Sequence, residues 1–112
     1  MRPNTKIRYL SGSFDSLKKK DMDKIKEVIW KFPLGRGSEA TIEMPVGFAV
    51  MTVGVIDDEI YVWAGGQLTE EKENRYFRIM ATGEEYSEED PLYYVGTAFL
   101  FDGKLVFHVF MK

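Results

Sequence analysis

The chain contains no cysteine among its 112 residues. This absence excludes a disulfide framework, a thiolate metal site and a cysteine nucleophile, and it suits a reducing compartment. The sequence also lacks any run of 18 or more apolar residues, so no segment is predicted to cross a membrane as a helix. Residues 1–10 lack the apolar core of a secretion signal. We therefore expect a cytoplasmic protein that has no membrane partner.

The apolar content is sufficient for a packed core. Hydrophobic residues make up 45% of the chain and aromatic residues 14%. A single domain of this length buries about two-thirds of the surface that its unfolded chain exposes, so it needs neither a metal nor a disulfide to fold. The sequence predicts one domain and no cofactor.

Charge is distributed unevenly along the chain. Residues 1–31 hold nine Lys and Arg against four acids, a net charge of +5, whereas residues 32–112 hold six basic residues against fourteen acids, a net charge of −8. Backbone contacts to nucleic acid need clustered Lys and Arg, so the acidic body argues against a nucleic-acid partner. The densest acidic run, Glu84 to Asp90, is interpreted as a solvated loop. The alternative is that it binds a basic partner.

Residues 1–25 are predicted to form a basic arm with a short helix. Ser13 is a suitable helix cap, and Phe14, Leu17 and Met22 lie near one helical stripe. Before this helix, Ile7–Leu10 has the character of a short extended piece. The arm is expected to fold back on the body or to clasp a second subunit.

Residues 26–112 are predicted to form an all-β domain. Apolar residues stand there at every second position or in continuous runs, and short turns containing Gly, Pro and Asp separate these segments. Connections this short require antiparallel pairing, and a compact sandwich or partly open barrel of about seven strands follows. The seven expected strands are Glu27–Phe32, Ala40–Met44, Phe48–Ile56, Glu59–Ala64, Arg75–Ala81, Tyr93–Phe101 and Lys104–Met111. Hairpins are predicted at Asp57-Asp58 and Asp102-Gly103, while Gly65-Gly66 is expected to end the fourth strand before a polar loop over Gln67–Glu73.

Residues suited to catalysis are few. His108 is the only histidine and stands among bulky apolar residues, so we interpret it as a packed imidazole that is hydrogen-bonded to a neighbour. One histidine without cysteine does not support a metal site. Neither a nucleophile elbow nor a phosphate-binding glycine loop occurs in the sequence. We therefore expect a protein that is not an enzyme.

Residues suited to recognition are more numerous. Tryptophan, tyrosine and arginine dominate binding hot spots because they combine large contact area with directed hydrogen-bond donors. The candidate ligand- or partner-binding residues are Trp30, Lys31, Trp63, Arg75, Arg78, Tyr94 and His108. The alternative is that both tryptophans fill the core while the arginines extend outward from it.

Six segments of the chain carry a resemblance to known sequences: IWKFPL at 29–34, IEMP at 42–45, YVWA at 61–64, RYFR at 75–78, YVGT at 94–97 and LVFHVF at 105–110. In these segments the chain resembles an uncharacterised family of small domains found in bacteriophages and prophages. Together they span about residues 29–110. Ala81 stands where the family tends to have glycine. The resemblance brings no established activity, but a phage origin implies a small accessory protein that acts in the cytoplasm of the infected bacterial host.

Three non-catalytic functions follow as expectations. The first is a binding protein that antagonises bacterial anti-phage defence by occluding a host defence protein. The second is a homo-oligomeric sponge, joined through the basic arm, that sequesters a nucleotide-derived immune signal between Trp30, Lys31, Arg75, Arg78 and His108. The third is a structural or assembly factor of the virion. The enzymatic alternative is a hydrolase that acts on the same signal.

Overall fold

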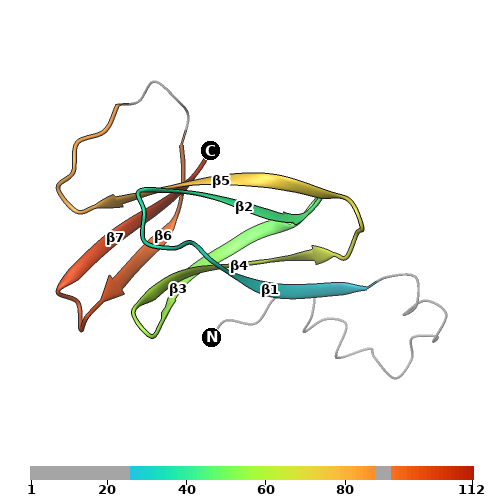
Figure 1. Ribbon diagram of the computed structural model, residues 1–112, viewed down its shortest axis with the longest axis horizontal. Helices are drawn as coiled ribbons and strands as arrows, with labels where there is room; N and C mark the ends of the chain where they lie inside the picture. The colour runs from blue at the N-terminus through green and yellow to red at the C-terminus, as the bar shows by residue number, and fades with distance from the viewer. Residues whose placement is uncertain (1–25, 88–91) are drawn as a thin grey trace.

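The computed structural model of the chain describes residues 26–87 and 92–112, and its regular structure there is entirely β (Figure 1). The strands are β1 (Glu27–Pro33), β2 (Glu39–Pro45), β3 (Ala49–Ile56), β4 (Glu59–Gln67), β5 (Lys72–Ala81), β6 (Tyr93–Leu100) and β7 (Leu105–Met111). The prediction of a mainly antiparallel β domain is confirmed. The predicted helix after Ser13 and the extended piece at Ile7–Leu10 lie outside the described residues. Across the described ranges, no helix has the length and apolar character needed to span a bilayer.

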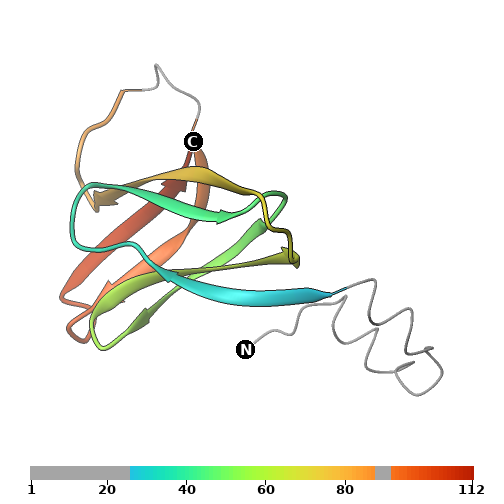
Figure 2. The same cartoon turned by 45° about the vertical axis from the view of Figure 1, so that its right-hand side comes forward.

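The strands form two antiparallel sheets packed face to face. One has three strands in the order β1-β4-β3, and the other has four in the order β2-β5-β7-β6. Figure 2 shows β2 and β5 in one layer with β1 and β4 in the other. At one side of the sandwich β3 and β6 lie close together. A Cβ atom added at Gly96 of β6 would be only 3.2 Å from Cβ of Val53 in β3. No ladder joins these two strands, so the sandwich is only partly closed.

Alternation along each central strand directs every second side chain into the space between the sheets. In β4, Ile60, Val62 and Ala64 are buried, and in β5 Phe77 and Ile79 are buried opposite them. This is the pattern expected when one face of an antiparallel sheet packs on a core. The buried hydrophobic cluster consists of Leu34, Met44, Phe48, Ile60, Val62, Ala64, Phe77, Ile79, Ala98, Leu100 and Val109.

Two tight turns close the predicted hairpins. In the β3–β4 turn both Asp57 and Asp58 have positive φ, the conformation that a two-residue type I′ turn requires. In the β6–β7 turn Phe101 and Asp102 also have positive φ, and the Gly103 N–H donates to the carbonyl of Leu100 at 3.1 Å. Both hairpins are confirmed. The second turn is a four-residue loop between the paired residues Leu100 and Leu105, and the Asp102-Gly103 pair that the sequence favours lies at its centre.

The fourth strand is longer than predicted. Gly65-Gly66 was expected to end it, but β4 continues to Gln67 because β1 pairs along this stretch, with Glu27 opposite Gln67 and Val28 opposite Gly66. A Cβ atom at Gly65 would lie 2.6 Å from the Val28 carbonyl oxygen. The glycine therefore permits a close approach of two strands and does not mark a turn. The polar loop that follows is correspondingly short, since β5 begins at Lys72.

Gly65→Ala is expected to lower the free energy of unfolding by about 1–3 kcal/mol, because the new methyl group must push β1 away from β4. Urea unfolding followed by tryptophan fluorescence measures the change. Gly37→Ala is the matched control, since the nearest atom to its Cβ would be 3.5 Å away, and it should change stability by less than about 0.5 kcal/mol. Equal effects of the two substitutions would contradict the close approach at Gly65.

Candidate functional site on the outer face of the four-stranded sheet

The outer face of the four-stranded sheet gathers aromatic side chains from three strands. Strand register places Arg78 of β5 beside Phe110 of β7, and Phe110 beside Tyr94 of β6. The next row holds His108, flanked by Met80 and Thr97. We call this surface the aromatic face. It consists of Tyr76, Arg78, Tyr86, Tyr94, Phe99, His108 and Phe110.

The aromatic face is open to solvent. The exposed fractions are 49% for Tyr76, 56% for Tyr94 and 61% for Phe99. The Tyr94 ring meets the Phe110 ring edge to face, with 5.3 Å between their centroids. Large rings held in defined contacts, but left half in water, are typical of a surface that binds another molecule.

His108 lies in the middle of this face, and both of its ring nitrogens have partners. Nε2 lies 2.7 Å from the Thr82 hydroxyl, and Nδ1 lies 3.3 Å from the Tyr94 hydroxyl and 3.4 Å from the Thr97 hydroxyl. The Tyr94 and Thr97 hydroxyls also bond to each other. Since a hydroxyl both donates and accepts, the network suits either tautomer of the imidazole. The interpretation of His108 as a hydrogen-bonded imidazole is confirmed, and its bonds fix the orientation of Tyr94.

The segment after β5 adds a further ring to the face. Strand β7 lies between β5 and β6 in the sheet. Residues 82–87 leave the end of β5 on the side away from the three-stranded sheet (Figure 1), and the Tyr86 ring lies 6.0 Å from that of Phe110. Glu84 to Ser87 are exposed, as expected for a solvated loop, and the rest of the acidic run lies outside the described residues.

Acidic side chains border the aromatic face. Glu39 of β2 stands opposite Arg78, and Glu43 stands opposite Asn74, both on the same outer side. Glu84 and Glu85 add negative charge from the β5–β6 connection. Lys72 of β5 and Lys112, whose N–H donates to the Tyr76 carbonyl, lie on the same outer side, so four acids and two lysines surround an apolar centre.

Lys31 and Trp63 lie on the opposite surface of the molecule, the outer face of the three-stranded sheet. They are register partners in β1 and β4. The Lys31 ammonium lies 5.4 Å from the Tyr61 ring centroid, and the Trp63 indole lies over Gly54, where a Cβ atom would come within 2.7 Å of it. These contacts make a second, smaller aromatic surface.

Trp30 belongs to neither outer face. Trp30 pairs with Ala64, so its side chain points between the two sheets at the β1 edge of the three-stranded sheet. There the Trp30 ring meets the Phe48 ring edge to face, with 5.7 Å between the ring centroids. It is 39% exposed, and neither tryptophan belongs to the buried cluster.

Arg75 points inward, away from Arg78. Its Nη2 donates to the Phe48 carbonyl at 2.6 Å and to Glu73 Oε2 at 2.6 Å, while Nε donates to the same carboxylate at 2.9 Å. The Gly47 N–H also donates to Glu73 at 3.4 Å. The hydrogen bonds from Arg75 and Gly47 lower the pKa of the Glu73 carboxyl. Glu73 and Arg75 therefore clamp the β2–β3 turn against the beginning of β5.

Three of the seven predicted residues therefore share one face: Arg78, Tyr94 and His108. Sequence reasoning missed the other four members, which are Tyr76, Tyr86, Phe99 and Phe110. The alternation of side chains along β5 would have placed Tyr76 on the same face as Arg78, because the two residues are two positions apart. Phe99, by contrast, joins Tyr94 only because a bulge near Val95 shifts the alternation of β6.

The residues offer no built metal site. Nowhere in ranges 26–87 and 92–112 do three His, Asp or Glu side chains gather in a way that could hold a metal ion. The groups present on the aromatic face can supply ring stacking, hydroxyl and imidazole hydrogen bonds, and one guanidinium.

Comparison with known proteins identifies the family of the chain. Residues 25–112 match the family described as a domain of unknown function, DUF7352, and the chain belongs to that family. No curated protein matches the chain. No solved structure matches it either.

Arg75→Ala is expected to lower the free energy of unfolding by about 1–3 kcal/mol, because it removes hydrogen bonds to a carboxylate and to the Phe48 carbonyl. Arg78→Ala, on the outer face, should change stability by less than about 0.5 kcal/mol. Chemical unfolding of both variants measures the difference. A larger loss for Arg78→Ala would contradict the assignment of the clamp to Arg75.

The clamp should also make stability depend on pH. The pKa of Glu73 is lowered in the folded state from its ordinary value of 4.5, so the carboxylate stabilises the fold above about that pH, and this stabilisation is lost as the pH falls through the lowered folded value. Thermal unfolding from pH 6 to pH 3 should show a shallower acid-induced fall in Tm for Glu73→Gln than for the unaltered chain. Parallel curves would show that Glu73 makes no contribution.

Proposed function

We propose that this domain is a non-catalytic protein-binding module whose aromatic face docks on a partner protein. The observation that carries the proposal is the set of half-exposed rings around Arg78 on one side of a rigid sheet. Tyrosine, phenylalanine and arginine in this arrangement bury a large area at low entropic cost, because a strand backbone and ring contacts already hold them. An open sheet face suits a protein surface better than it suits a small molecule, which needs a concave site.

The charge of the rim suggests the partner's chemistry. The four acids Glu39, Glu43, Glu84 and Glu85 outnumber the two lysines around the apolar centre, so the complementary surface should be apolar with an excess of Lys or Arg around it. The same acidic rim disfavours nucleic acid. Sequestration of a nucleotide-derived signal is the weaker alternative, because Trp30, Lys31 and Arg75 lie away from Arg78 and His108.

The proposal extends to biological context. The resemblance to small phage and prophage domains suggests that the chain is phage-encoded and that its partner is a protein of a bacterial anti-phage defence system, which it occludes in the host cytoplasm. A virion structural or assembly role would use the same face on a virion protein.

Photo-crosslinking tests the proposal. A benzoylphenylalanine placed at Tyr76 should crosslink one protein in cells that carry candidate defence systems, whereas the same group at Tyr61, on the other sheet, should not. With that protein purified, Tyr76→Ala and Arg78→Ala should each weaken binding at least tenfold, as expected of hot-spot residues, while Tyr61→Ala should leave it unchanged.

Other outcomes would overturn it. Equal crosslinking from Tyr61, or binding that is insensitive to Tyr76→Ala and Arg78→Ala, would move the interface off the aromatic face. A native mass spectrum that shows an oligomer carrying a small additional mass would replace occlusion with sequestration.

A further inference from the structure

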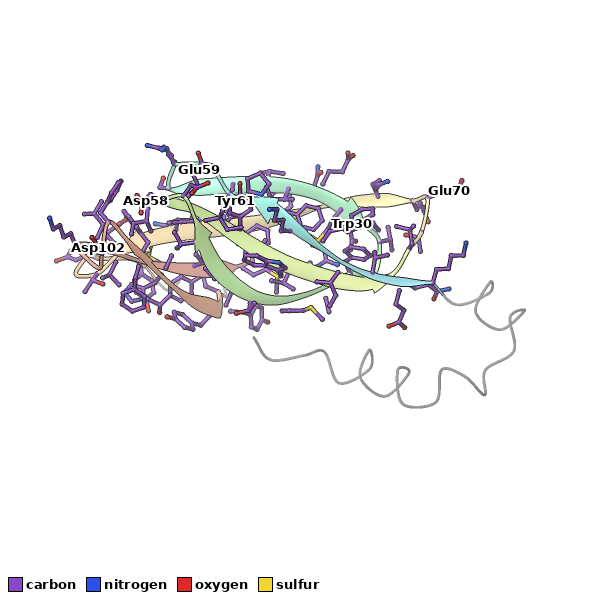
Figure 3. All side chains as sticks on the ribbon, turned by 90° about the horizontal axis from the view of Figure 1, so that it is seen from below. Trp30, Asp58, Glu59, Tyr61, Glu70 and Asp102 are labelled. Carbon is purple, nitrogen blue, oxygen red and sulfur yellow. The ribbon has the colours of Figure 1, made fainter. Side chains whose placement is uncertain are left out.

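Strand β2 forms one edge of the four-stranded sheet. Among the strands that the structure describes, it pairs with β5 alone. Figure 3 shows Glu59 at one end of the molecule and Glu70 at the other. Just before β2, the Arg36 guanidinium lies 4.0 Å from the Glu59 carboxylate. The last residue of β2, Pro45, stands opposite Lys72 toward the Glu70 end. The edge therefore runs between the two ends, and its seven residues extend over about 23 Å.

The backbone of β2 directs its hydrogen-bonding groups alternately toward β5 and away from it. At one end the Ile79 N–H donates to the Ser38 carbonyl at 2.8 Å. At the other end the Val46 N–H donates to the Glu71 carbonyl at 2.9 Å. Bonded positions in an antiparallel ladder recur at every second residue, so the even-numbered residues of β2 bond to β5. The N–H and C=O groups of the odd-numbered residues point away from β5, where a further strand can pair with them.

Two acidic side chains stand on the outer side of this edge. The odd-numbered residues that carry an N–H are Glu39, Thr41 and Glu43, and all three are exposed. The residues between them, Ala40 and Ile42, are half-buried and pack against the core. Because side chains that face each other across two paired strands share one side of the sheet, an added strand would present every second residue to the acids and the others to the apolar pair.

A second copy of β2 is a poor occupant of this edge. Antiparallel pairing of two such edges around Thr41 would place Glu39 of each copy opposite Glu43 of the other, and like charges directly opposite each other destabilise a strand pair. Charges on an edge strand commonly prevent self-association in this way. The same two carboxylates attract a strand of opposite charge, so they select the partner as well as exclude the second copy.

We propose that β2 binds an extended basic segment of another protein as an added antiparallel strand. The segment carries Lys or Arg at two positions four residues apart, opposite Glu39 and Glu43. The residues next to these cations are apolar, since they stand opposite Ala40 and Ile42. In strand addition the backbone hydrogen bonds supply affinity and alternate side chains supply specificity. This contact uses the edge of the sheet and not the aromatic face, so it goes beyond the proposed function.

The full chain and synthetic peptides test the proposal. The probe is the acetylated and amidated peptide Thr-Lys-Val-Thr-Val-Lys-Thr, called the Lys peptide. In ¹H–¹⁵N spectra it should shift the amide signals of Glu39, Thr41 and Glu43 saturably, with a dissociation constant on the order of 1 mM or lower. Because the added strand accepts hydrogen bonds from these three N–H groups, their hydrogen exchange should also slow severalfold. The same peptide with Glu in place of both Lys, the Glu peptide, should have neither effect.

Substitutions separate the contributions of charge and backbone. Glu39→Lys combined with Glu43→Lys should weaken Lys-peptide binding at least tenfold and favour the Glu peptide. Glu70→Lys combined with Glu85→Lys changes the net charge equally outside β2 and should preserve the preference. Thr41→Pro removes the central outward N–H, a loss that an edge strand tolerates, and should weaken binding at least tenfold, whereas Thr41→Ala should not.

Several outcomes would overturn this proposal. They are equal effects of the two peptides, shifts without slowed exchange, and slow exchange of the same three amides in the free chain, which would assign the edge to a second copy or to another segment of the chain. None of them bears on crosslinking at Tyr76. Conversely, binding of the Lys peptide without a crosslink at Tyr76 would support strand addition and overturn docking on the aromatic face.

Discussion

The structure depends on the packing of two sheets through every second side chain of their strands. Val62 of β4, Phe77 of β5 and Val109 of β7 are essentially inaccessible and belong to one cluster. A slip of one residue in any strand would exchange its buried and exposed sets, so this packing fixes which side chains face outward. The aromatic face is thus the reverse side of the core: Arg78, His108 and Phe110 face solvent because their neighbours Phe77, Ile79 and Val109 are buried.

Much of this arrangement is predictable from the sequence. The period of two, the turn residues and the short connections predict seven antiparallel strands and both hairpins. Gly65-Gly66 was predicted to end a strand because two adjacent glycines are typical of a turn. Only the pairing of β1 with β4, two segments distant in the sequence, shows that these glycines let the two backbones approach closely. The residues next to Gly65 in the sequence do not indicate that a distant strand lies against it.

The candidate site was harder to predict. Arg75 and Arg78 lie three residues apart on one strand, so strand alternation alone predicts that their side chains point to opposite faces. The sequence does not show, however, that the Arg75 guanidinium donates hydrogen bonds to Glu73 and to the Phe48 carbonyl. Tyr94 and Phe99 are five residues apart and would face opposite ways in a regular strand; the bulge near Val95 brings them to the same side. Bulges and ion pairs that close a turn depend on tertiary context, and this explains why only part of the face was anticipated.

The strand order bears on how the chain reaches its native state. Only β3–β4 and β6–β7 join consecutive strands, while β1–β4, β2–β5 and β5–β7 pair segments that are distant in the chain. The local hairpins can close quickly, but the other pairings require large loops to be ordered first. Because β7 separates β5 from β6, the pairing of β5 with β7 closes a loop that contains β6. Folding should therefore be slow for a chain of this size, on the order of milliseconds to seconds.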